Sequence, residues 1–330
     1  MDYAIRAQHL CKTFRVHKRE AGLAAAIRST LFRKYATIKA VDDISFDVKR
    51  GEVVGFIGPN GAGKSTAIKM LIGVLKSDSG KVEVLGFRPF EQRKQLVKRI
   101  GVVFGQKTQL WWDLPAIDTL RLMKDIYDVP QADWNARYEM LDGILGLDEF
   151  IRSPVRKLSL GQRMRAEIAA ALLHGPELIL LDEPTVGVDV VGKERIRGFI
   201  AGINKRLGTT VLLTSHDMFD VEKLCKRVVI IDFGRIVYDG SLETLREKYV
   251  HRKRITLTFS MPVAEKTVSR LGYEWKKRTD TTYSFWVPKK EVPDFLEGVL
   301  AGFRIVDIKV EEPGIDAVIA DIFRHKGAGA

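Results

Sequence analysis

Short apolar runs and stretches of helical periodicity alternate along the first two thirds of the chain. The apolar runs are typical of strands buried on both faces of a parallel sheet, and they are Val53–Ile57, Ile100–Phe104, Leu178–Leu181 and Val211–Leu213. Between them, the pattern predicts helices at 67–72, 118–127 and 134–145. This order of elements predicts an α/β fold.

The pattern changes after residue 243. From about residue 247, short segments of alternating polarity such as 254–259 and 282–287 predict strands, and helices are predicted at 263–271 and 292–300. We therefore expect two domains, a first at 1–246 and a small α+β domain at 247–330. None of the motifs in the second domain carries chemistry, and we expect its tail at 326–330 to be disordered.

A glycine-rich loop follows the first apolar run. Residues 58–66 read Gly-Pro-Asn-Gly-Ala-Gly-Lys-Ser-Thr, the pattern of a phosphate-binding loop. Glycine lets successive backbone N–H groups turn toward phosphate oxygens, and the start of the next helix adds a partial positive charge. A chance match is the alternative, but few chance matches would lie between a strand and a helix.

The side chains of this loop suit a nucleoside triphosphate. Lys64 supplies a positive charge to the β- and γ-phosphates, and the Ser65 hydroxyl is suited to Mg²⁺. The residues predicted to bind ATP are Gly58, Asn60, Gly61, Ala62, Gly63, Lys64, Ser65 and Thr66. The sequence therefore predicts a protein that binds ATP and Mg²⁺.

Two carboxylates, Asp182 and Glu183, follow the apolar run at 178–181. Open parallel sheets bind their ligands at the carboxyl ends of the strands. We expect Asp182 to hold Mg²⁺, directly or through water, and Glu183 to polarise the water that attacks the γ-phosphate. An acidic strand end that only caps a turn is the alternative interpretation.

A further motif lies about twenty residues before these carboxylates, where residues 158–162 read Leu-Ser-Leu-Gly-Gln. It resembles the signature sequence of ATP-binding-cassette (ABC) ATPases, in which two subunits enclose two ATP molecules. The resemblance implies that Ser159, Gly161 and Gln162 approach the γ-phosphate bound to a second copy of the chain. Leu160 departs from the family pattern, where glycine is common, and this bears on how closely the backbone can approach. Ser159 is also suited to an ordinary helix N-cap.

Single residues extend the resemblance. It implies that Gln106 binds metal and links the nucleotide site to a helical subdomain, that His216 contacts the γ-phosphate, and that Asp189 lies in a loop at the dimer interface. Together with Glu183, Gln106 and His216 are the predicted catalytic residues. Phe14 is implied to stack on adenine, which needs only an aromatic face. A structural histidine and a core phenylalanine are the alternatives.

The resemblance also implies a fold. It is that of a P-loop NTPase of the ABC type, with a RecA-like core, an antiparallel β edge and a helical subdomain at about 107–173. Trp111 and Trp112 begin that subdomain, and aromatic residues of this kind are enriched at interfaces. We expect them to form part of a groove for a membrane subunit, although packing within the subdomain is an alternative.

Composition agrees with a globular protein of more than one domain, with 330 residues, 45% hydrophobic and 29% charged. No apolar run approaches the roughly 20 residues that span a bilayer, and the N-terminus lacks the apolar segment of a signal peptide. Cys11 and Cys225 lack metal-ligand spacing and fit a reducing compartment. We therefore expect a cytosolic protein without a structural metal.

The net charge of +12 is compatible with nucleic-acid binding, so its distribution matters. Residues 15–39 hold seven basic residues and one acidic residue, about half of the excess. Within them, Leu23, Ile27, Leu31 and Tyr35 recur every four residues, which predicts a basic amphipathic helix. We hypothesise that it contacts a membrane partner or anionic lipid headgroups. The alternative is a helix on its own domain with a solvated basic face, and nucleic acid is not expected.

The functional prediction is an ATPase subunit that works as a homodimer under separate membrane permease subunits, at the cytoplasmic face of the membrane. The basic insert, the stretch from Gln106 to Pro115 and the C-terminal extension most resemble those of type-2 bacterial exporters. The alternative is a soluble ABC ATPase that acts on ribosomes or DNA. A kinase or GTPase that shares only the glycine-rich loop would not account for Ser159–Gln162 or His216.

Overall fold

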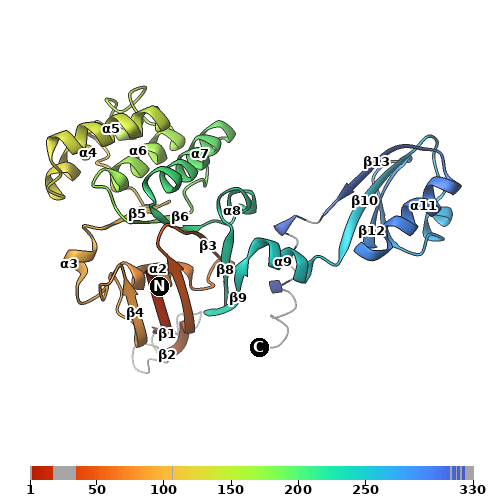
Figure 1. The fold of residues 1–330 in the computed structure, drawn as a ribbon, viewed down its shortest axis with the longest axis horizontal. Coiled ribbons are helices and arrows are strands. Elements are labelled where there is room, and N and C mark those ends of the chain that lie inside the picture. The colour runs from red at the N-terminus through yellow and green to blue at the C-terminus, as the bar shows by residue number, and fades with distance from the viewer. Residues whose placement is uncertain are drawn as a thin grey trace, which may run out of the picture. The chain divides into compact units, whose positions relative to one another are not determined.

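The computed structural model describes residues 2–17, 35–105, 107–312, 314–316, 318–319 and 322–323. The chain divides into two compact units, Met1–Gly240 and Ser241–Ala330, and each is described by itself (Figure 1). Gln106, the central part of the basic insert and the tail at 326–330 lie outside the described residues. Among the described helices, none combines the length and the apolar character that crossing a bilayer requires.

The first unit contains two sheets. An antiparallel sheet has the strand order β2-β1-β4, and a six-stranded sheet has the order β5-β6-β7-β3-β8-β9. From β5 to β8, neighbouring strands run parallel. The strands are β1 (Tyr3–His17), β2 (Tyr35–Lys49), β3 (Val53–Ile57), β4 (Ser79–Val84), β5 (Ile100–Phe104), β6 (Leu178–Asp182), β7 (Thr210–Thr214), β8 (Arg227–Asp232) and β9 (Arg235–Ser241).

The helices of this unit confirm the predicted alternation of strands and helices. The predicted segments 118–127 and 134–145 fall within α4 and α5, each to within a few residues. The helices are α2 (Lys64–Leu71), α3 (Arg93–Leu96), α4 (Ala116–Ile126), α5 (Gln131–Leu145), the 3-10 helix η1 (Val155–Lys157), α6 (Leu160–Leu172), α7 (Val190–Leu207) and α8 (Met218–Leu224).

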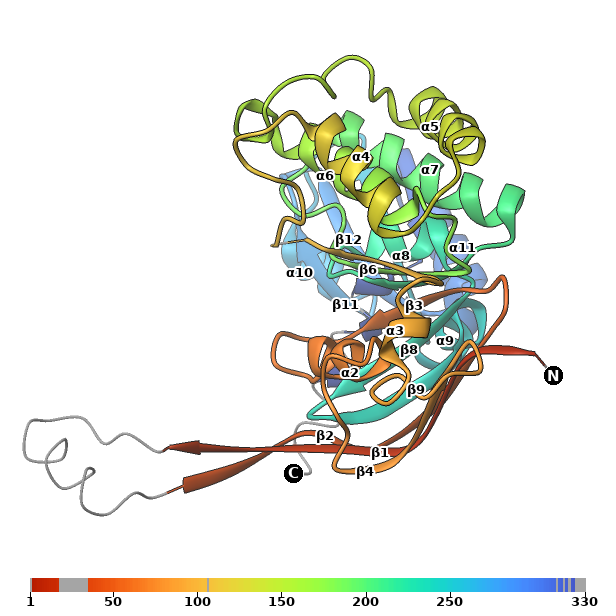
Figure 2. The same cartoon turned by 90° about the vertical axis from the view of Figure 1, so that its left-hand side faces the viewer.

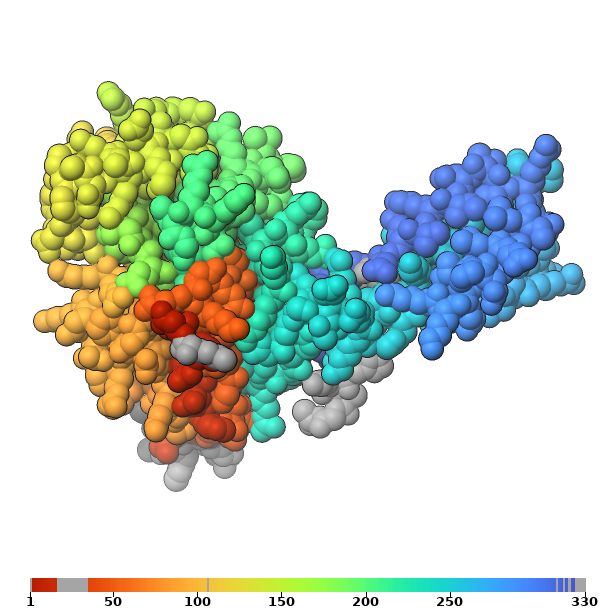
Figure 3. Space-filling model, in the orientation of Figure 1, coloured from red at the N-terminus to blue at the C-terminus, as the bar shows by residue number. Residues whose placement is uncertain are grey.

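The elements of this unit are segregated in space. Helices α4, α5 and α6, which we call the helical part, gather at one end. The antiparallel strands lie at the other end, and the six-stranded sheet lies between them (Figures 1 and 2). In the space-filling view, the helical part, in yellow and green, and the strands β1 and β2, in red, cover different regions of the surface (Figure 3). Strand β7 is buried along its whole length, as its apolar run requires, and the central strands join the antiparallel strands in one core.

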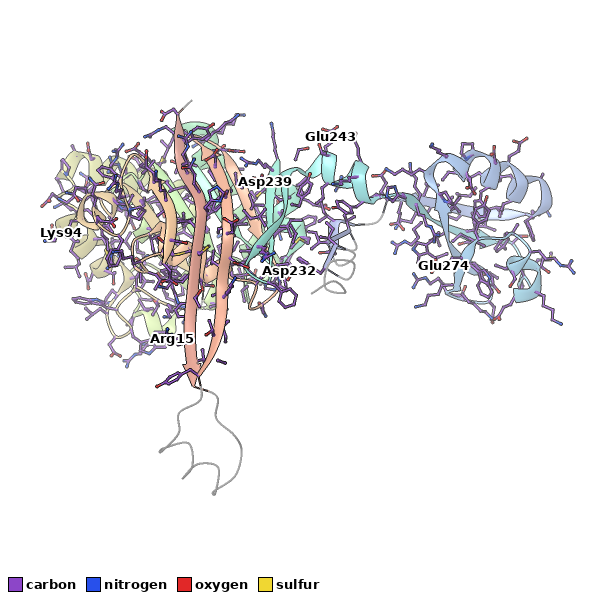
Figure 4. The ribbon with its side chains drawn as sticks, turned by 90° about the horizontal axis from the view of Figure 1, so that it is seen from below. Arg15, Lys94, Asp232, Asp239, Glu243 and Glu274 are labelled. Atoms are coloured by element: carbon purple, nitrogen blue, oxygen red, sulfur yellow. The ribbon has the colours of Figure 1, made fainter. Side chains whose placement is uncertain are left out.

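Strands β1 and β2 continue past the end of β4 as a two-stranded ribbon (Figure 2). Figure 4 shows Arg15 near the far end of this ribbon. The prediction that Tyr35 lies on an amphipathic helix is wrong, because Tyr35 begins β2 and pairs with His17. The predicted helical positions Leu23, Ile27 and Leu31 lie outside the described residues.

The second unit has the order β-α-β-β-α-β within its main part, as in ferredoxin-like folds. Its sheet has the order β11-β12-β10-β13 and is antiparallel, and its core lies between the sheet and the helices. This confirms the predicted α+β character. Its elements are α9 (Leu242–Tyr249), β10 (Arg252–Phe259), α10 (Glu265–Ser269), β11 (Glu274–Lys277), β12 (Thr282–Pro288), the 3-10 helix η2 (Lys289–Glu291), α11 (Val292–Gly302) and β13 (Ile305–Glu311).

Candidate active site

A cleft of about 600 Å³ lies at the carboxyl ends of the parallel strands β3, β5 and β6. Ligands of open parallel sheets bind at this edge. The cleft brings together the glycine-rich loop and the two predicted carboxylates. Its lining residues are Ala40, Pro59, Asn60, Gly61, Ala62, Gly63, Lys64, Ser65, Thr66, Lys69, Val74, Phe104, Gly105, Lys107, Asp182, Glu183, Val186 and His216.

The glycines of the loop have distinct reasons for lacking a Cβ. Gly61 and Gly63 have φ angles of +84° and +107°, which favour glycine. Gly58 lacks a positive φ, but a Cβ there would lie 2.2 Å from the carbonyl oxygen of Ile231. Gly63 is also the N-cap of α2 and provides no side-chain cap, so the first N–H groups of α2 are available for an anion.

Lys64 is held in the loop by its own backbone. Its Nζ donates to the carbonyl oxygen of Gly58 at 2.5 Å and to that of Pro59 at 3.1 Å. Lys64 is only 8% exposed, and burial lowers its pKa below the ordinary value, although Glu183 and Asp182 oppose this shift. The amine is therefore fixed close to where a phosphate would sit.

The carboxylate pair is positioned by the neighbouring strand β7. Asp182 and Thr214 are register partners, and the Thr214 hydroxyl donates to Asp182 Oδ1 at 2.5 Å. The backbone N–H of Glu183 donates to the Thr214 carbonyl oxygen at 3.1 Å. Glu183 has a φ of +55°, a left-handed conformation that is uncommon outside glycine. The Asp182 carboxylate is held by Thr214, whereas the Glu183 carboxylate faces His216.

Glu183 and His216 form a pair at the cleft. Glu183 Oε2 lies 2.6 Å from His216 Nδ1 and accepts the His216 backbone N–H at 3.2 Å. The imidazole is 68% exposed, whereas the carboxylate is 21% exposed. His216 is therefore oriented by the carboxylate while its ring remains open to a ligand, and a purely structural role inside the core does not fit this exposure.

Two oxygen-bearing side chains that line the cleft fit Mg²⁺. This ion prefers oxygen ligands and is usually held by one or two protein groups together with substrate phosphates. Asp182 contributes a carboxylate with one oxygen already held by Thr214, and Ser65 lines the same cleft with a hydroxyl. Asp182 and Ser65 would hold the ion, and bound Mg²⁺ would neutralise part of the phosphate charge.

The signature residues form the beginning of α6. Ser159 is its N-cap, and the capping box is complete: Ser159 Oγ accepts the Gln162 N–H at 3.2 Å, and Gln162 Oε1 accepts the Ser159 N–H at 2.9 Å. Leu160 packs against Gly187, where a Cβ would lie 2.5 Å from Leu160 Cδ2. The departure from glycine at position 160 is therefore accommodated by a glycine in the neighbouring loop.

Several predicted residues lie outside the cleft of a single copy. Among the described residues, its lining does not include Ser159, Gly161 or Gln162. Phe14 is also outside the lining, and with 37% exposure it is not a core residue, which excludes the alternative interpretation. The predicted role of Gln106 falls on a residue outside the described part of the chain.

Sequence reasoning missed residues that support the site from other elements. Thr214 binds both carboxylate residues, and its position at the end of an apolar run was the available signal. Lys69 and Lys107 add positive charge to the cleft wall. Asp189, predicted for the dimer interface, is the N-cap of α7 and accepts the Gly192 N–H at 2.8 Å.

Comparison with known families agrees with this geometry. Residues 41–186 match the family model described as ABC transporter, and residues 251–311 match the model described as EvrA-like ABC transporter, C-terminal domain. The two matches fall in the two compact units separately.

Individual proteins match over most of their length. The linearmycin resistance ATP-binding protein LnrL of Bacillus subtilis (strain 168) is 36% identical over 300 residues, 88% of this chain and 95% of LnrL. The bacitracin transport ATP-binding protein BcrA of Bacillus licheniformis is 35% identical over 247 residues, 74% of this chain and 78% of BcrA. The structure of cbiO1 from Clostridium perfringens, described as part of the ABC transporter complex cbiONQ, has a TM-score of 0.60 and 27% identity and covers 75% of this chain and 92% of cbiO1. This chain is an ABC-type ATPase and belongs to the family of ABC transporter ATP-binding subunits.

Proposed function

We propose that two copies of this chain close around two ATP molecules and thereby power an exporter whose permease subunits are separate membrane proteins. ATP would be bound with Mg²⁺ in each cleft. Closure on ATP and reopening after hydrolysis would act as a switch on the permease at the cytoplasmic face of the membrane.

The observation that carries this proposal is the separation of two half-sites within one copy. The phosphate loop and carboxylates line the cleft, whereas Ser159, Gly161 and Gln162 are absent from the described lining. Ser159 is exposed at the start of a helix, where N–H groups and a partial positive charge favour an anion. A second copy would bring this helix end to the open side of the cleft.

The start of α7 supports an interface on the same side of the protein. Val190 and Val191 follow the Asp189 N-cap and are 81% and 65% exposed. We call residues 158–162 the signature turn. It packs onto the loop before α7, because a Cβ on Gly161 would lie 3.3 Å from a methyl group of Val188. Exposed apolar residues beside the signature turn suit a contact between copies.

The residues of the cleft suggest how hydrolysis proceeds. Lys64 and the N–H groups of the loop would stabilise the negative charge that develops on the phosphates. The Glu183 carboxylate would accept a proton from the attacking water, and the His216 ring would bind the γ-phosphate while its contact with Glu183 orients both groups. Phe14 would stack on adenine from the β1–β2 ribbon.

An exposed apolar patch suits the permease. Trp111, Trp112 and Leu114 are 52%, 50% and 38% exposed and lie at the start of the helical part, shortly after the cleft residue Lys107 in sequence. Aromatic side chains of this size are enriched in interface hot spots. Packing of both tryptophans inside the unit does not fit these exposures. The basic residues Arg15 and Lys39 of the ribbon would add contact with anionic lipid headgroups.

Two variants test the nucleotide cycle. Lys64→Ala is expected to abolish ATP binding or turnover, and Glu183→Gln is expected to retain binding and accumulate an ATP-bound dimer, measured by size-exclusion chromatography with ATP and Mg²⁺. Hydrolysis by Glu183→Gln at the parental rate would refute the assignment of the base. A monomer at every ATP concentration would refute closure.

The transport proposal needs a separate experiment. The tagged chain is extracted from native membranes in mild detergent, and co-purifying proteins are identified by mass spectrometry. A polytopic membrane protein in stoichiometric amount is expected, and uptake and efflux assays in vesicles with that partner then determine the direction. Ribosomal or DNA-repair proteins in place of a permease would overturn the proposal.

A further inference from the structure

Glu167 is a buried carboxylate in the middle of α6, the helix that carries the signature residues at its start. It is 4% exposed, and within the described part of the chain it forms no ion pair. Isolated charges are costly to bury unless hydrogen bonds satisfy them. The groups that satisfy Glu167 therefore indicate what it holds in place.

Its hydrogen bonds come from the segment that leaves the cleft. We call residues 108–115 the strap. The Thr108 hydroxyl donates to Glu167 Oε1, and the Gln109 N–H lies 3.2 and 3.3 Å from the two carboxylate oxygens. Gln109 Nε2 also donates to the Glu167 backbone carbonyl oxygen at 3.1 Å. Burial raises the pKa of the Glu167 carboxyl, and these hydrogen bonds oppose that shift.

The strap connects this carboxylate to the cleft. Immediately before it, the Lys107 N–H donates to the Phe104 carbonyl oxygen at 3.0 Å, and the Gly105 N–H donates to the Asp182 carbonyl oxygen at 2.8 Å. Lys107, Gly105 and Asp182 all line the nucleotide cleft. We call Gly105 and Lys107 the cleft lip. A displacement of the cleft lip reaches the strap directly, because the strap follows Lys107 in the chain.

The far part of the strap is bound to the rest of the helical part. The Trp111 N–H donates to Thr119 Oγ1 at 3.1 Å, and Thr119 is fully buried in α4. The Trp112 carbonyl oxygen accepts the Arg156 N–H at 3.0 Å, just before the signature turn. Glu167 joins the beginning of the strap to α6, and Arg163 of α6 lies over the Trp112 ring, 5.7 Å from its centroid.

We propose that Glu167 is a positioning residue for ATP hydrolysis, which fixes the strap to α6 so that the cleft lip and the signature turn move as one body. Separating strap and helix would leave a buried carboxylate without its donors, and this cost keeps them together. The inference rests on the proposed closure of two copies, in which the signature turn of one copy completes the site of the other.

Glu167→Gln is the first test, because it preserves size while replacing one acceptor oxygen by an NH₂ group that faces donors. We expect the dissociation constant for ATP to change less than about twofold and kcat to fall about tenfold, since binding uses the loop and turnover needs the positioned signature turn. Thr108→Val is expected to act in the same direction. If both residues act through one contact, the double variant is no worse than the stronger single variant.

Glu177→Gln is a matched control, because Glu177 also accepts hydrogen bonds, from Arg50 and Arg99. Glu177 lies just before the amino end of β6, whereas the cleft lies at the carboxyl end of this strand. It is expected to lower thermal stability and leave kcat of the folded protein unchanged. Amide hydrogen exchange is expected to increase at Gln109 and Leu110 in Glu167→Gln but not in Glu177→Gln.

Two outcomes would overturn the role of Glu167. One is Glu167→Gln with parental kcat, even if it is less stable, and the other is additive losses in the double variant. These outcomes are separate from failure of the proposed closure, which is read from the ATP-dependent dimer of Glu183→Gln. The turnover comparison decides the role of Glu167 in either case.

Discussion

Gly63 and Gly61 allow a matched test of why the phosphate loop needs glycine. Both have positive φ angles, +107° and +84°, so alanine at either position is strained by about 1–3 kcal/mol. A Cβ on Gly63 would also lie 2.3 Å from the carbonyl oxygen of Ala40, whereas a Cβ on Gly61 would meet nothing within 4 Å. Ala40 directly precedes Val41, which is fully buried, so the carbonyl has little freedom to withdraw.

The expected destabilisation follows from these contacts. Gly61→Ala is expected to cost the strain alone, and Gly63→Ala a further 1–3 kcal/mol or so for the clash with β2. The difference corresponds to a separation in Tm of about 2–12 °C, at about 2–4 °C per kcal/mol for a unit of this size. Differential scanning calorimetry without nucleotide measures it, since ligand binding would shift both values. Equal destabilisation of the two variants would refute the argument that contact with Ala40 excludes a side chain.

Two further predictions concern buried titratable groups. Burial lowers the pKa of His174 to about 4, so stability is full above pH 6.5 and falls toward pH 4. In urea titrations, the free energy of unfolding of the parental protein is expected to fall by about 2 kcal/mol between pH 6.5 and pH 5, relative to that of His174→Phe. This variant retains an aromatic ring against Tyr127. Parallel pH profiles of the two proteins would contradict the prediction. Asp220→Asn breaks the buried contact with Arg197 and is expected to lower the free energy of unfolding by about 3–5 kcal/mol. Glu194→Gln, at the exposed partner of the same arginine, is expected to lower it by less than about 1 kcal/mol. Similar urea midpoints of the two variants would contradict the prediction.

The sequence was sufficient where a local pattern determines the structure. The run Val53–Ile57 is buried as β3, and the loop after it lines the cleft with Lys64. Ser159 is the N-cap that its position before a helix predicts. These features depend on neighbours within a few residues, so hydrophobic periodicity and capping preferences are enough to locate them.

Features that depend on distant partners were not predictable in this way. Tyr35 fits a four-residue repeat, but its structure is set by cross-strand pairing with His17. Glu167 is of a charged type that is rarely buried, yet it is buried because Thr108 and Gln109 supply donors from 58 or more residues away. A single sequence carries no local signal for contacts of this kind.

At Glu183, the residue that would give the most stable backbone differs from the residue that the site needs. Its left-handed φ of +55° would suit glycine, and a side chain there costs about 1 kcal/mol or more. Selection for heat resistance alone would therefore favour glycine at this position and discard the carboxylate that faces His216. Any effort to stabilise this enzyme by sequence design must hold position 183 fixed, because the most relaxed backbone there belongs to a protein without its proposed base.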